Sequence, residues 1–564
     1  MKHKNILAAC LLGMTLCTNA EAQEAQFGYF KYQGNDHRFS QAIDPHRQYY
    51  NPVMAGFYPD PSVCRAGDNY YLVNSSFSFF PGVPIFTSKD LVNWQQLGYV
   101  LDHDSQLPLK HQNVSGGIFA PAITYNEKNK TFYMITTNVG AGNFVVKTKD
   151  PRKGWSEPIY LPKIDGIDPS ICFDKKGNGW IVHNAPVMGK TEYEGQRAIR
   201  LLRYDVKGDS TVGKPIEIVR GGTHVEKHPI WIEGPHLYQI GSYYYLMCAE
   251  GGTGAWHSEV IFRAKKPQGP WEECPNNPIL TQRTGVDPNR EDPVSSTGHA
   301  DLVQAKDGSW WAVFLGCRPY EQDYYNTGRD TYLMPVTWKN GWPTILEKNK
   351  VLPNIVEKPG LQPLQDANVI RYSGNFSYED NFKGDKLGMR WMFLRNPDNK
   401  FYTVGNGLTI HPKDVNISQK ESPAAVFCRQ QHTNFTAETA LRYEPRTQKD
   451  LAGVVLLQNE RFNFVFGKTL RDGQPVVTLT KSEKEQSVIA SAPLSADKDN
   501  QPLRLKIEGH DHRGLCRDDS VSGIRLEYGL TIEQRADIIN CQTRRHHLER
   551  ETGIERLVIL AISL

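Results

Sequence analysis

The sequence contains few cysteines, and none of them is spaced for metal binding. Ten cysteines occur in 564 residues, and no two form a Cys-x-x-Cys motif. Structural zinc sites and disulfide-rich secreted domains both depend on closely spaced cysteines. The sequence therefore excludes a zinc-finger protein and a fold built on disulfides. Cys64 and Cys172 lie inside apolar strand patterns, so we expect them to be buried thiols.

Long hydrophobic runs are also missing from most of the chain. Beyond residue 22 no apolar run approaches the roughly 20 residues that a membrane helix needs, so we expect no membrane partner. Residues 1–22 combine two lysines, an apolar stretch and the small-residue site Ala20-Glu21-Ala22. This pattern predicts a cleaved secretory signal and an exported protein, periplasmic or secreted. Lipidation of Cys17 is the alternative, although Leu16 is bulkier than the residue that usually precedes a lipidated cysteine.

A strong charge of either sign is absent as well. The formal net charge is +3, and no basic run stands out before residue 345. Because nucleic-acid-binding proteins carry basic patches or stripes, we expect no nucleic-acid partner. The chain is rich in aromatic residues that favour β-strands. Its 564 residues are more than a single hydrophobic core ordinarily serves. These features predict two domains of the all-β class.

Five similar segments follow one another over residues 49–345. In each, a candidate cavity residue is followed eight or nine residues later by a tight turn and then by an aromatic strand. Gly, Asn, Asp or Ser at the turns, flanked by β-formers, predict five hairpins. The first positions are Asp60, Ala120, Asp168, Glu233 and His299, and the turns lie at residues 66–69, 127–130, 176–179, 240–242 and 306–309.

The spacing of the hairpins predicts a five-bladed β-propeller. Successive hairpins lie roughly 50 to 65 residues apart, which accommodates a four-stranded blade and its loops. Because a repeat places equivalent positions at equivalent points in space, we expect Asp60, Asp168, Glu233 and His299 to converge on one axis. An open β-sandwich is the alternative, and it would have no shared axis.

Three acidic residues occupy first positions of their segments. Asp60 and Asp168 each begin an Asp-Pro-Ser triplet, and Glu233 begins Glu-Gly-Pro. A single such aspartate is more often a turn or capping residue, and a lone glutamate is often a salt-bridged wall residue. Three acids in phase with the repeat argue against both of these structural roles. Crowded carboxyl groups in an apolar funnel repel one another and are desolvated, so their proton affinities separate. Hydrolysis of a glycosidic bond needs such a carboxylic acid and carboxylate together.

These acids and their flanking motifs resemble glycoside hydrolase family 43 over about residues 50–345. The resemblance is carried by Asn51-Pro52, Tyr58-Pro59-Asp60-Pro61-Ser62, Gly82-Val83-Pro84-Ile85, Ser88-Lys89-Asp90-Leu91-Val92-Asn93-Trp94, Gly116-Gly117-Ile118-Phe119-Ala120-Pro121, Ile167-Asp168-Pro169-Ser170, Glu233-Gly234-Pro235-His236, Gly298-His299-Ala300-Asp301, Thr327-Gly328-Arg329-Asp330-Thr331 and Gly341-Trp342-Pro343. It implies an inverting mechanism with Asp60 as general base and Glu233 as general acid. Asp168 would adjust the proton affinity and the orientation of Glu233. An inverting pair lies roughly 6.5 to 9.5 Å apart.

The resemblance also implies substrate-binding residues. It places Arg329 near the base and the sugar hydroxyls, and His299 at the axis beneath the pocket. By residue type alone, Arg329 is as often a surface cation, and His299 is more often a core histidine than a ligand. In this family a cation or water sometimes lies near the equivalent histidine, which leaves calcium near His299 open. No calcium loop is present, and no metal site or required cofactor is predicted. Phe77, Phe80 and Phe119 are predicted to wall a small sugar pocket, with core packing as the alternative.

The remaining chain is predicted to hold a second domain. Residues 346–375 read as a linker and residues 376–564 as a β-sandwich of short alternating strands, while residues 23–48 are set apart as an N-terminal extension. From about residue 510 the alternation stops and Arg and His become frequent. We interpret this atypical tail as a frame change in the coding sequence or as a tail that packs poorly, with a terminal variant with helices as the alternative. Missing closing strands would leave an exposed sheet edge.

The predicted function is that of an exo-acting glycosidase. It would release terminal β-D-xylosyl or α-L-arabinofuranosyl residues from plant hemicellulose or its oligosaccharides. The two sugars present similar hydroxyl geometry to one pocket, so the sequence does not distinguish between them. The predicted partner is thus a pentose-containing oligo- or polysaccharide. An endo-acting arabinanase and a non-catalytic carbohydrate-binding propeller are the alternatives, and the latter would be expected to lack one of the three acids.

Overall fold

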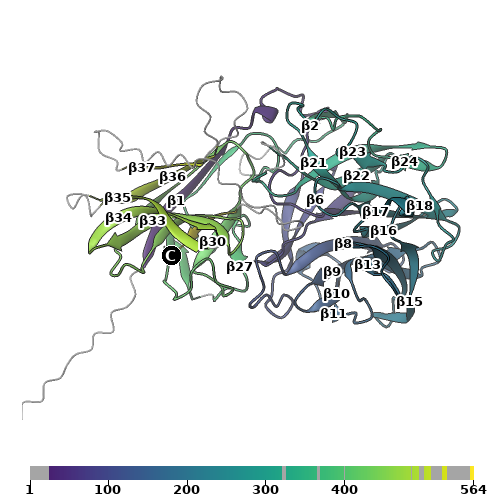
Figure 1. Cartoon of the computed structure of the whole chain (residues 1–564), viewed down its shortest axis with the longest axis horizontal. Helices are drawn as coiled ribbons and strands as arrows, with labels where there is room; N and C mark the ends of the chain where they lie inside the picture. Colours follow the sequence, from purple (N-terminus) through teal and green to yellow (C-terminus); the bar gives the residue numbers. More distant parts are fainter. Residues whose placement is uncertain are drawn as a thin grey trace, which may run out of the picture.

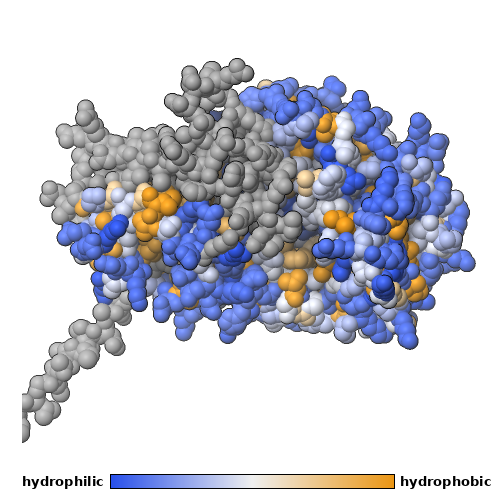
Figure 2. Space-filling view, in the orientation of Figure 1, coloured by the Kyte–Doolittle hydropathy of each residue, from blue (hydrophilic) through white to orange (hydrophobic). Residues whose placement is uncertain are grey.

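The computed structural model describes residues 24–319, 325–364, 369–398, 400–483, 485–494, 501–509, 524–529 and 559–563, so the predicted signal lies outside it. Strands dominate this part, and the helices in it are three 3-10 turns, η1 (His37–Phe39), η2 (Pro151–Lys153) and η3 (Val225–Lys227). The all-β prediction is confirmed. None of the helices in the described ranges has the length and hydropathy to cross a membrane. The described surface is mostly hydrophilic on the face in Figure 2, with small separate hydrophobic patches.

Five antiparallel sheets follow one another along the first domain (Figure 1). Each predicted hairpin joins the first two strands of one sheet. The sheets are β3 (Ser62–Ala66), β4 (Asn69–Val73), β6 (Gly82–Ser88) and β7 (Gln95–Leu101); β8 (Ile118–Asn126), β9 (Thr131–Asn138), β10 (Gly142–Thr148) and β11 (Ile159–Tyr160); β12 (Ile167–Phe173), β13 (Gly179–Pro186), β14 (Arg197–Asp205) and β15 (Ser210–Arg220); β16 (Glu233–Ile240), β17 (Tyr243–Glu250), β18 (Ser258–Ala264), β19 (Glu272–Glu273) and β20 (Leu280–Thr281); and β21 (Ser295–Gln304), β22 (Trp310–Cys317), β23 (Asp330–Lys339) and β24 (Trp342–Thr344).

The first strands of these sheets form a closed ring of contacts. β3 contacts β8, β8 contacts β12, β12 contacts β16, β16 contacts β21, and β21 contacts β3 again. Strands enclosed in this way are buried on both faces, as β21 is along all but its two end residues. The ring gathers side chains of distant segments about one interior, which an open sandwich would not do.

The second domain consists of two sheets that share one apolar cluster. The first runs in the order β28 (Tyr402–Gly405), β29 (Gly407–Ile410), β1 (Ala25–Gly34), β31 (Phe435–Arg442), β36 (Leu503–Gly509) and β37 (Ile524–Gly529), with β26 (Ser377–Asp380) also pairing β1. The second runs β30 (Ala425–Arg429), β38 (Ile559–Ser563), β32 (Ala452–Leu457), β33 (Phe462–Arg471), β34 (Gln474–Glu483) and β35 (Glu485–Pro493). Apolar residues from both sheets pack together in it, as in a β-sandwich.

The N-terminal segment is part of this second domain. β1 alternates buried and exposed residues and buries Phe27, Phe30 and Tyr32 in the shared cluster. Residues 23–48 were set apart by sequence as an extension, but β1 lies in the middle of a sheet whose other strands come from beyond residue 376. Local alternation identifies a strand without identifying its partners, so the sequence did not reveal this pairing.

Two segments of the tail also form strands. β37 pairs with β36, and β38 lies between β30 and β32. Residues 524–529 and 559–563 thus supply a strand to each sheet: β38 fills the place between β30 and β32, and β37 is the end strand of the first sheet. The rest of the tail lies outside the described residues.

Short strand pairs tie the two domains and the linker together. β2 (Gln48–Tyr50) pairs with β25 (Ile355–Glu357), and β5 (Phe79–Phe80) pairs with β27 (Phe393–Leu394). Linker residues Leu352, Val356 and Tyr372 pack in the same apolar cluster as first-domain strands. The segment after residue 345 thus runs along the first domain before the second begins.

Candidate active site

One backbone conformation recurs near the start of each of the five sheets. Positive φ values occur at Asp60 (49°), Ala120 (40°), Asp168 (54°), Gly234 (54°) and His299 (53°). Pairing with the neighbouring strand shifts register beside four of these positions. Such bulges take a side chain out of the regular alternation, and a non-glycine residue with positive φ costs on the order of 1–3 kcal/mol. The contacts described below show that four of the five positions meet.

The backbone equivalence corrects the sequence alignment of the fourth segment by one residue. Gly234, and not Glu233, shares the conformation and the following residue Pro235 with the Asp-Pro pairs at 60 and 168. A Cβ at position 234 would come within 2.9 Å of the His299 ring. Gly234 is therefore required there, and Glu233 reaches the site from the residue before.

Asp60 is buried and held by three side chains. Ser75 Oγ donates to its Oδ2 (2.6 Å), Arg329 Nη1 donates to its Oδ1 (2.6 Å), and His299 Nδ1 lies 3.7 Å from the same oxygen. Burial works to raise the pKa of Asp60, but Arg329, His299 and the Ser75 hydrogen bond outweigh it and hold the pKa below its ordinary value. Asp60 is therefore a carboxylate at neutral pH.

Glu233 and Asp168 have the opposite electrostatic character. Burial, together with the charge of Asp60, raises the pKa of Glu233 to about 7 against the opposing effects of Arg329, Thr253 and Arg197. Burial and the neighbouring Glu233 and Asp60 raise the pKa of Asp168 well above its ordinary value. Gly234 N–H donates to Asp168 Oδ2 (3.2 Å), and Thr253 Oγ1 donates to Glu233 Oε1 (3.2 Å).

The three carboxyl groups thus share one electrostatic environment. Asp60 raises the pKa of both other acids, and Arg329 lowers it for all three. Such separation of pKa values leaves Asp60 as the carboxylate at neutral pH and raises the proton affinity of both Glu233 and Asp168. The predicted separation of 6.5 to 9.5 Å between acid and base stays a prediction.

His299 and Arg329 both lie beside Asp60. His299 is buried beside Asp60, and burial lowers its pKa to about 4, so its imidazole is neutral. Arg329 is 9% exposed and lies with its guanidinium carbon 5.6 Å from the centre of the Phe77 ring. Arg329 is therefore no surface cation.

Two of the three predicted aromatic residues lie together. The rings of Phe77 and Phe119 are 5.1 Å apart, and Phe119 is only half-buried. Phe80 packs in a different apolar cluster with Val83 and Leu101. The role of Phe80 as a pocket wall stays a prediction.

Sequence reasoning missed a group beside Glu233. Arg197 is half-buried, donates to Asn184 Oδ1 through Nη2 (2.6 Å) and lies 5.0 Å from the centre of the Trp231 ring. Trp231 is 40% exposed, and Gly252, next to the Thr253 that contacts Glu233, lies against it. The only sequence signal was the position of Trp231, two residues before Glu233.

The site does not match a calcium cage. Calcium takes six to eight oxygen ligands, whereas the Asp60 oxygen nearest His299 already accepts a hydrogen bond from Arg329. In the described part of the chain, one group brings three metal-ligand atoms within 4.8 Å of one another, and it lies elsewhere. The residues around His299 therefore do not fit a calcium ion held by protein oxygens.

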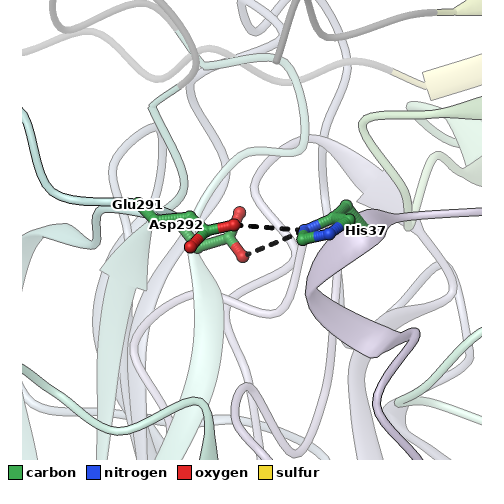
Figure 3. A group of neighbouring side chains, drawn as sticks. All are labelled: His37, Glu291 and Asp292. Carbon is green, nitrogen blue, oxygen red and sulfur yellow. Dashed lines mark ion pairs between the residues drawn. The ribbon is translucent and has the colours of Figure 1, made fainter. Parts of the chain in front are cut away.

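That other group lies where η1 meets the loop before β21. Figure 3 shows His37 facing Glu291 and Asp292, with Nδ1 3.6 Å and 3.9 Å from their carboxylate oxygens. His37 and Glu291 are largely exposed. Exposed ion pairs of this kind are common and weak, and nothing about the group points to a bound ion.

The described cysteines form no disulfide. Cys172, Cys248, Cys274, Cys317 and Cys428 are buried free thiols, and Cys64 is free and half-buried. The expectation of a buried thiol is confirmed for Cys172 and only partly met at Cys64.

Comparison with known proteins relates both domains to one group of enzymes. Residues 49–343 match the family model for glycosyl hydrolases family 43, and residues 379–519 match the model described as a beta xylosidase C-terminal concanavalin A-like domain. The chain is 36% identical over 459 residues to a non-reducing end alpha-L-arabinofuranosidase of Bacteroides ovatus, covering 78% of this chain and 79% of the relative. It is 39% identical over 417 residues to a xylosidase/arabinosidase of Butyrivibrio fibrisolvens, covering 72% and 77%.

A solved structure agrees over nearly the whole chain. A family 43 protein retrieved from a capybara gut metagenome superimposes with a TM-score of 0.84 at 39% identity, covering 96% of this chain and 99% of that one. A family 43 protein of Bacteroides ovatus gives a TM-score of 0.77 at 32% identity, with 92% and 95% covered. Together with the buried carboxyl groups of opposite character, these matches show that the chain belongs to glycosyl hydrolase family 43.

Proposed function

We propose that this chain is an exported, inverting exo-glycosidase that releases terminal β-D-xylosyl or α-L-arabinofuranosyl residues from plant hemicellulose or its oligosaccharides. The observation that carries the proposal is the divergence of pKa values within one buried group, with Asp60 below its ordinary value and Glu233 at about 7. The xylosidase and arabinofuranosidase names of relatives at 36% and 39% identity support the choice of sugars. The signal-like residues 1–22 support export.

In this proposal the five sheets are the blades of a five-bladed propeller. The closed ring of contacts among β3, β8, β12, β16 and β21 supports it, because five radially arranged sheets bring their first strands together in this way. The recurrence of one backbone conformation at the same point of each sheet supports it as well. The sugar would then enter along the axis that the first strands surround.

Asp60 is the general base and Glu233 the general acid. Asp60 accepts a proton from a water whose oxygen bonds to the anomeric carbon, while Glu233 gives its proton to the leaving oxygen and the glycosidic bond breaks. The anomeric configuration inverts in this single displacement. Asp168 keeps the proton affinity of Glu233 high, Arg329 holds Asp60 ionised and contacts sugar hydroxyls, and Phe77 and Phe119 wall the sugar. His299 supports Asp60 from the axis, and no cofactor takes part.

The pH dependence of kcat/KM is expected to be bell-shaped. Asp60 has a lowered pKa and works as a carboxylate, so activity is lost only at pH values below those at which an ordinary aspartate is protonated. Glu233 has a pKa of about 7 and works protonated, so activity falls as the pH rises above that value. Because Arg197 lowers the pKa of Glu233, Arg197→Met is expected to move the alkaline limb upward. Rates measured from pH 3 to 9 check both, and a wild-type alkaline limb below pH 5.5 would contradict the assignment.

The experiment that tests the function compares two chromogenic substrates. We expect the purified protein to hydrolyse aryl β-D-xyloside, aryl α-L-arabinofuranoside or both, and to release one pentose at a time from oligosaccharides. Proton NMR during turnover is expected to show the inverted anomer first. Sugar binding without turnover would favour the carbohydrate-binding alternative, and mid-chain cleavage of arabinan would favour the endo-acting one.

Trp231 is expected to contact the leaving group. It lies on the Glu233 side of the site, where the departing sugar must lie if Glu233 protonates its oxygen. Trp231→Ala should therefore lower kcat/KM on oligosaccharides about tenfold, a typical loss for one aromatic contact. Hydrolysis of the pentosyl fluoride, which has no leaving sugar, should change less than about threefold.

The exposed Tyr160, on the outer strand β11, provides a matched aromatic control. Tyr160→Ala is expected to leave both substrates unaffected. Equal losses on oligosaccharide and fluoride in Trp231→Ala would assign Trp231 to general structural support instead.

A further inference from the structure

We propose that the second domain positions the catalytic base, and that Arg429 is the positioning residue through which it acts. This inference rests on the proposed role of Asp60. It concerns the buried contact between the two domains, called the seam here, which includes residues 429–431 and the backbone of residues 55–57.

The end of β30 is a buried polar segment. Residues 429–433 read Arg-Gln-Gln-His-Thr, and each is at most 6% exposed. A run of five buried polar residues is costly unless its groups find partners. Two members of this run, Arg429 and Gln431, find partners in the first domain, in the few residues that precede Asp60. His432 and Thr433 bind Tyr32 and Asp36 instead.

Arg429 makes the central contact of the seam. Its Nε donates to the carbonyl oxygen of Phe57 (2.7 Å), and its guanidinium carbon lies 4.6 Å from the centre of the Tyr58 ring. Nearby, Gln431 Nε2 donates to the carbonyl oxygen of Ala55 (3.1 Å). A charged donor and a cation–π contact in a buried site are among the stronger polar interactions available to a protein.

Residues 55–60 are tightly packed, so the contacts at Ala55, Phe57 and Tyr58 also hold the position of Asp60. Gly56 has φ +97°, and a Cβ there would come within 2.7 Å of the Gln430 carbonyl oxygen, so the two domains touch by their backbones. Tyr58 N–H donates to the carbonyl oxygen of Arg329 (3.0 Å). Only Pro59, whose ring fixes φ, separates Tyr58 from Asp60.

A buried ion-pair network links the second domain to Arg329, the partner of Asp60. Arg318 Nη2 donates to the Gln431 carbonyl oxygen (2.9 Å), and Nε and Nη2 donate to Asp330 (3.0 Å each). Asp330 accepts from Gly56 N–H (2.6 Å) and directly follows Arg329, whose guanidinium binds Asp60. The second domain therefore reaches the base both through its preceding backbone and through its arginine.

Loss of Arg429 is expected to loosen this arrangement at Asp60. Arg429→Met keeps side-chain length and removes the hydrogen bond to Phe57. We expect kcat to fall on the order of 100-fold, the effect of a misplacement of about 1 Å, with KM changed less than about threefold. A weaker Asp60–Arg329 pair leaves burial to raise the pKa of Asp60, so the acid limb of the pH profile should move to higher pH. Arg429→Lys, which retains a charged donor, should recover part of kcat.

Arg395 is the matched control, because it is also a fully buried arginine of the seam. Its Nε donates to the Gln112 carbonyl oxygen (2.6 Å), away from residues 55–60. Arg395→Met is expected to lower Tm while leaving the acid limb in place. If Arg429→Met does not fold, Arg429→Lys is compared with Arg395→Lys by the same measurements.

The outcomes separate this inference from the proposed function. Equal acid limbs in the Arg429 and Arg395 variants, or wild-type kcat in a folded Arg429→Met, would overturn the positioning role. Retained activity in Asp60→Asn would instead show that Asp60 is not the base, whatever the Arg429 variants do. An upward shift of the acid limb confined to the Arg429 variants supports the inference.

Discussion

Glu233→Gln is expected to lower kcat on xylo-oligosaccharides by roughly 10²- to 10⁴-fold, the range for loss of a general acid. Glutamine keeps the shape of the side chain and its contact with Thr253 but has no proton to give. At neutral pH a group with a pKa of about 7 is about half protonated, so the wild-type enzyme has this proton available. Steady-state kinetics on oligosaccharides, with sugar binding measured by calorimetry, check the expectation.

The leaving group provides the decisive comparison for Glu233→Gln. An aryl pentoside whose phenol is acidic needs little protonation, so its hydrolysis should fall much less than that of the oligosaccharide. The alkaline limb of the pH profile should disappear with the acid. Glu226→Gln, at a largely exposed position in η3, is the control and should behave as wild type. Equal losses on both substrates, or an unchanged alkaline limb, would contradict the role of Glu233.

Asp60→Asn is expected to reduce kcat by a similar factor, roughly 10²- to 10⁴-fold, on every substrate. Asparagine keeps hydrogen-bonding capacity toward Ser75 but cannot accept the proton of the attacking water. Because water attack is required whatever the leaving group, aryl pentosides and oligosaccharides should lose activity alike. Kinetics on both substrate types test this contrast with Glu233→Gln.

The control for Asp60→Asn is an aspartate of the neighbouring hairpin turn. Asp68 is largely exposed and pairs with Lys306, and Asp68→Asn should leave kcat unchanged. A circular dichroism spectrum and Tm establish that Asp60→Asn is folded, since Arg329 loses its charged partner in a buried place. Activity of folded Asp60→Asn within tenfold of wild type would show that another group activates the water.

Residue patterns predicted much of the first domain because the relevant signals are local. The turn at residues 66–69 and its four counterparts combine turn-forming residues with β-formers, and each became the predicted hairpin. The Asp-Pro steps at 60 and 168 marked two of the acidic positions, but not their positive φ values, because a residue before proline ordinarily has an extended backbone. Glu233 was placed one residue out of phase, because glycine at 234 shows its purpose only when the His299 ring lies against it.

Errors in the second domain came from pairing. β1 and β38 are short alternating or apolar segments near opposite ends of the chain, and each lies between strands that are distant in sequence. Nothing in a short strand specifies which partner it takes when several have the same pattern. The tail was interpreted as atypical because Arg and His become frequent there and alternation stops, yet residues 524–529 and 559–563 form strands.

The amino-acid sequence by itself determined the class of the fold, the five hairpins and the identity of the three acids, because turn chemistry, alternation and short motifs act between neighbours. Only the tertiary structure decided which acid holds its proton, since the pKa values depend on burial and on charges brought from other segments. It alone also brought Arg429 to Phe57, 372 residues away, and Arg197 to the Glu233 side of the site. Contacts over such separations depend on how whole sheets pack, and no local pattern encodes that packing.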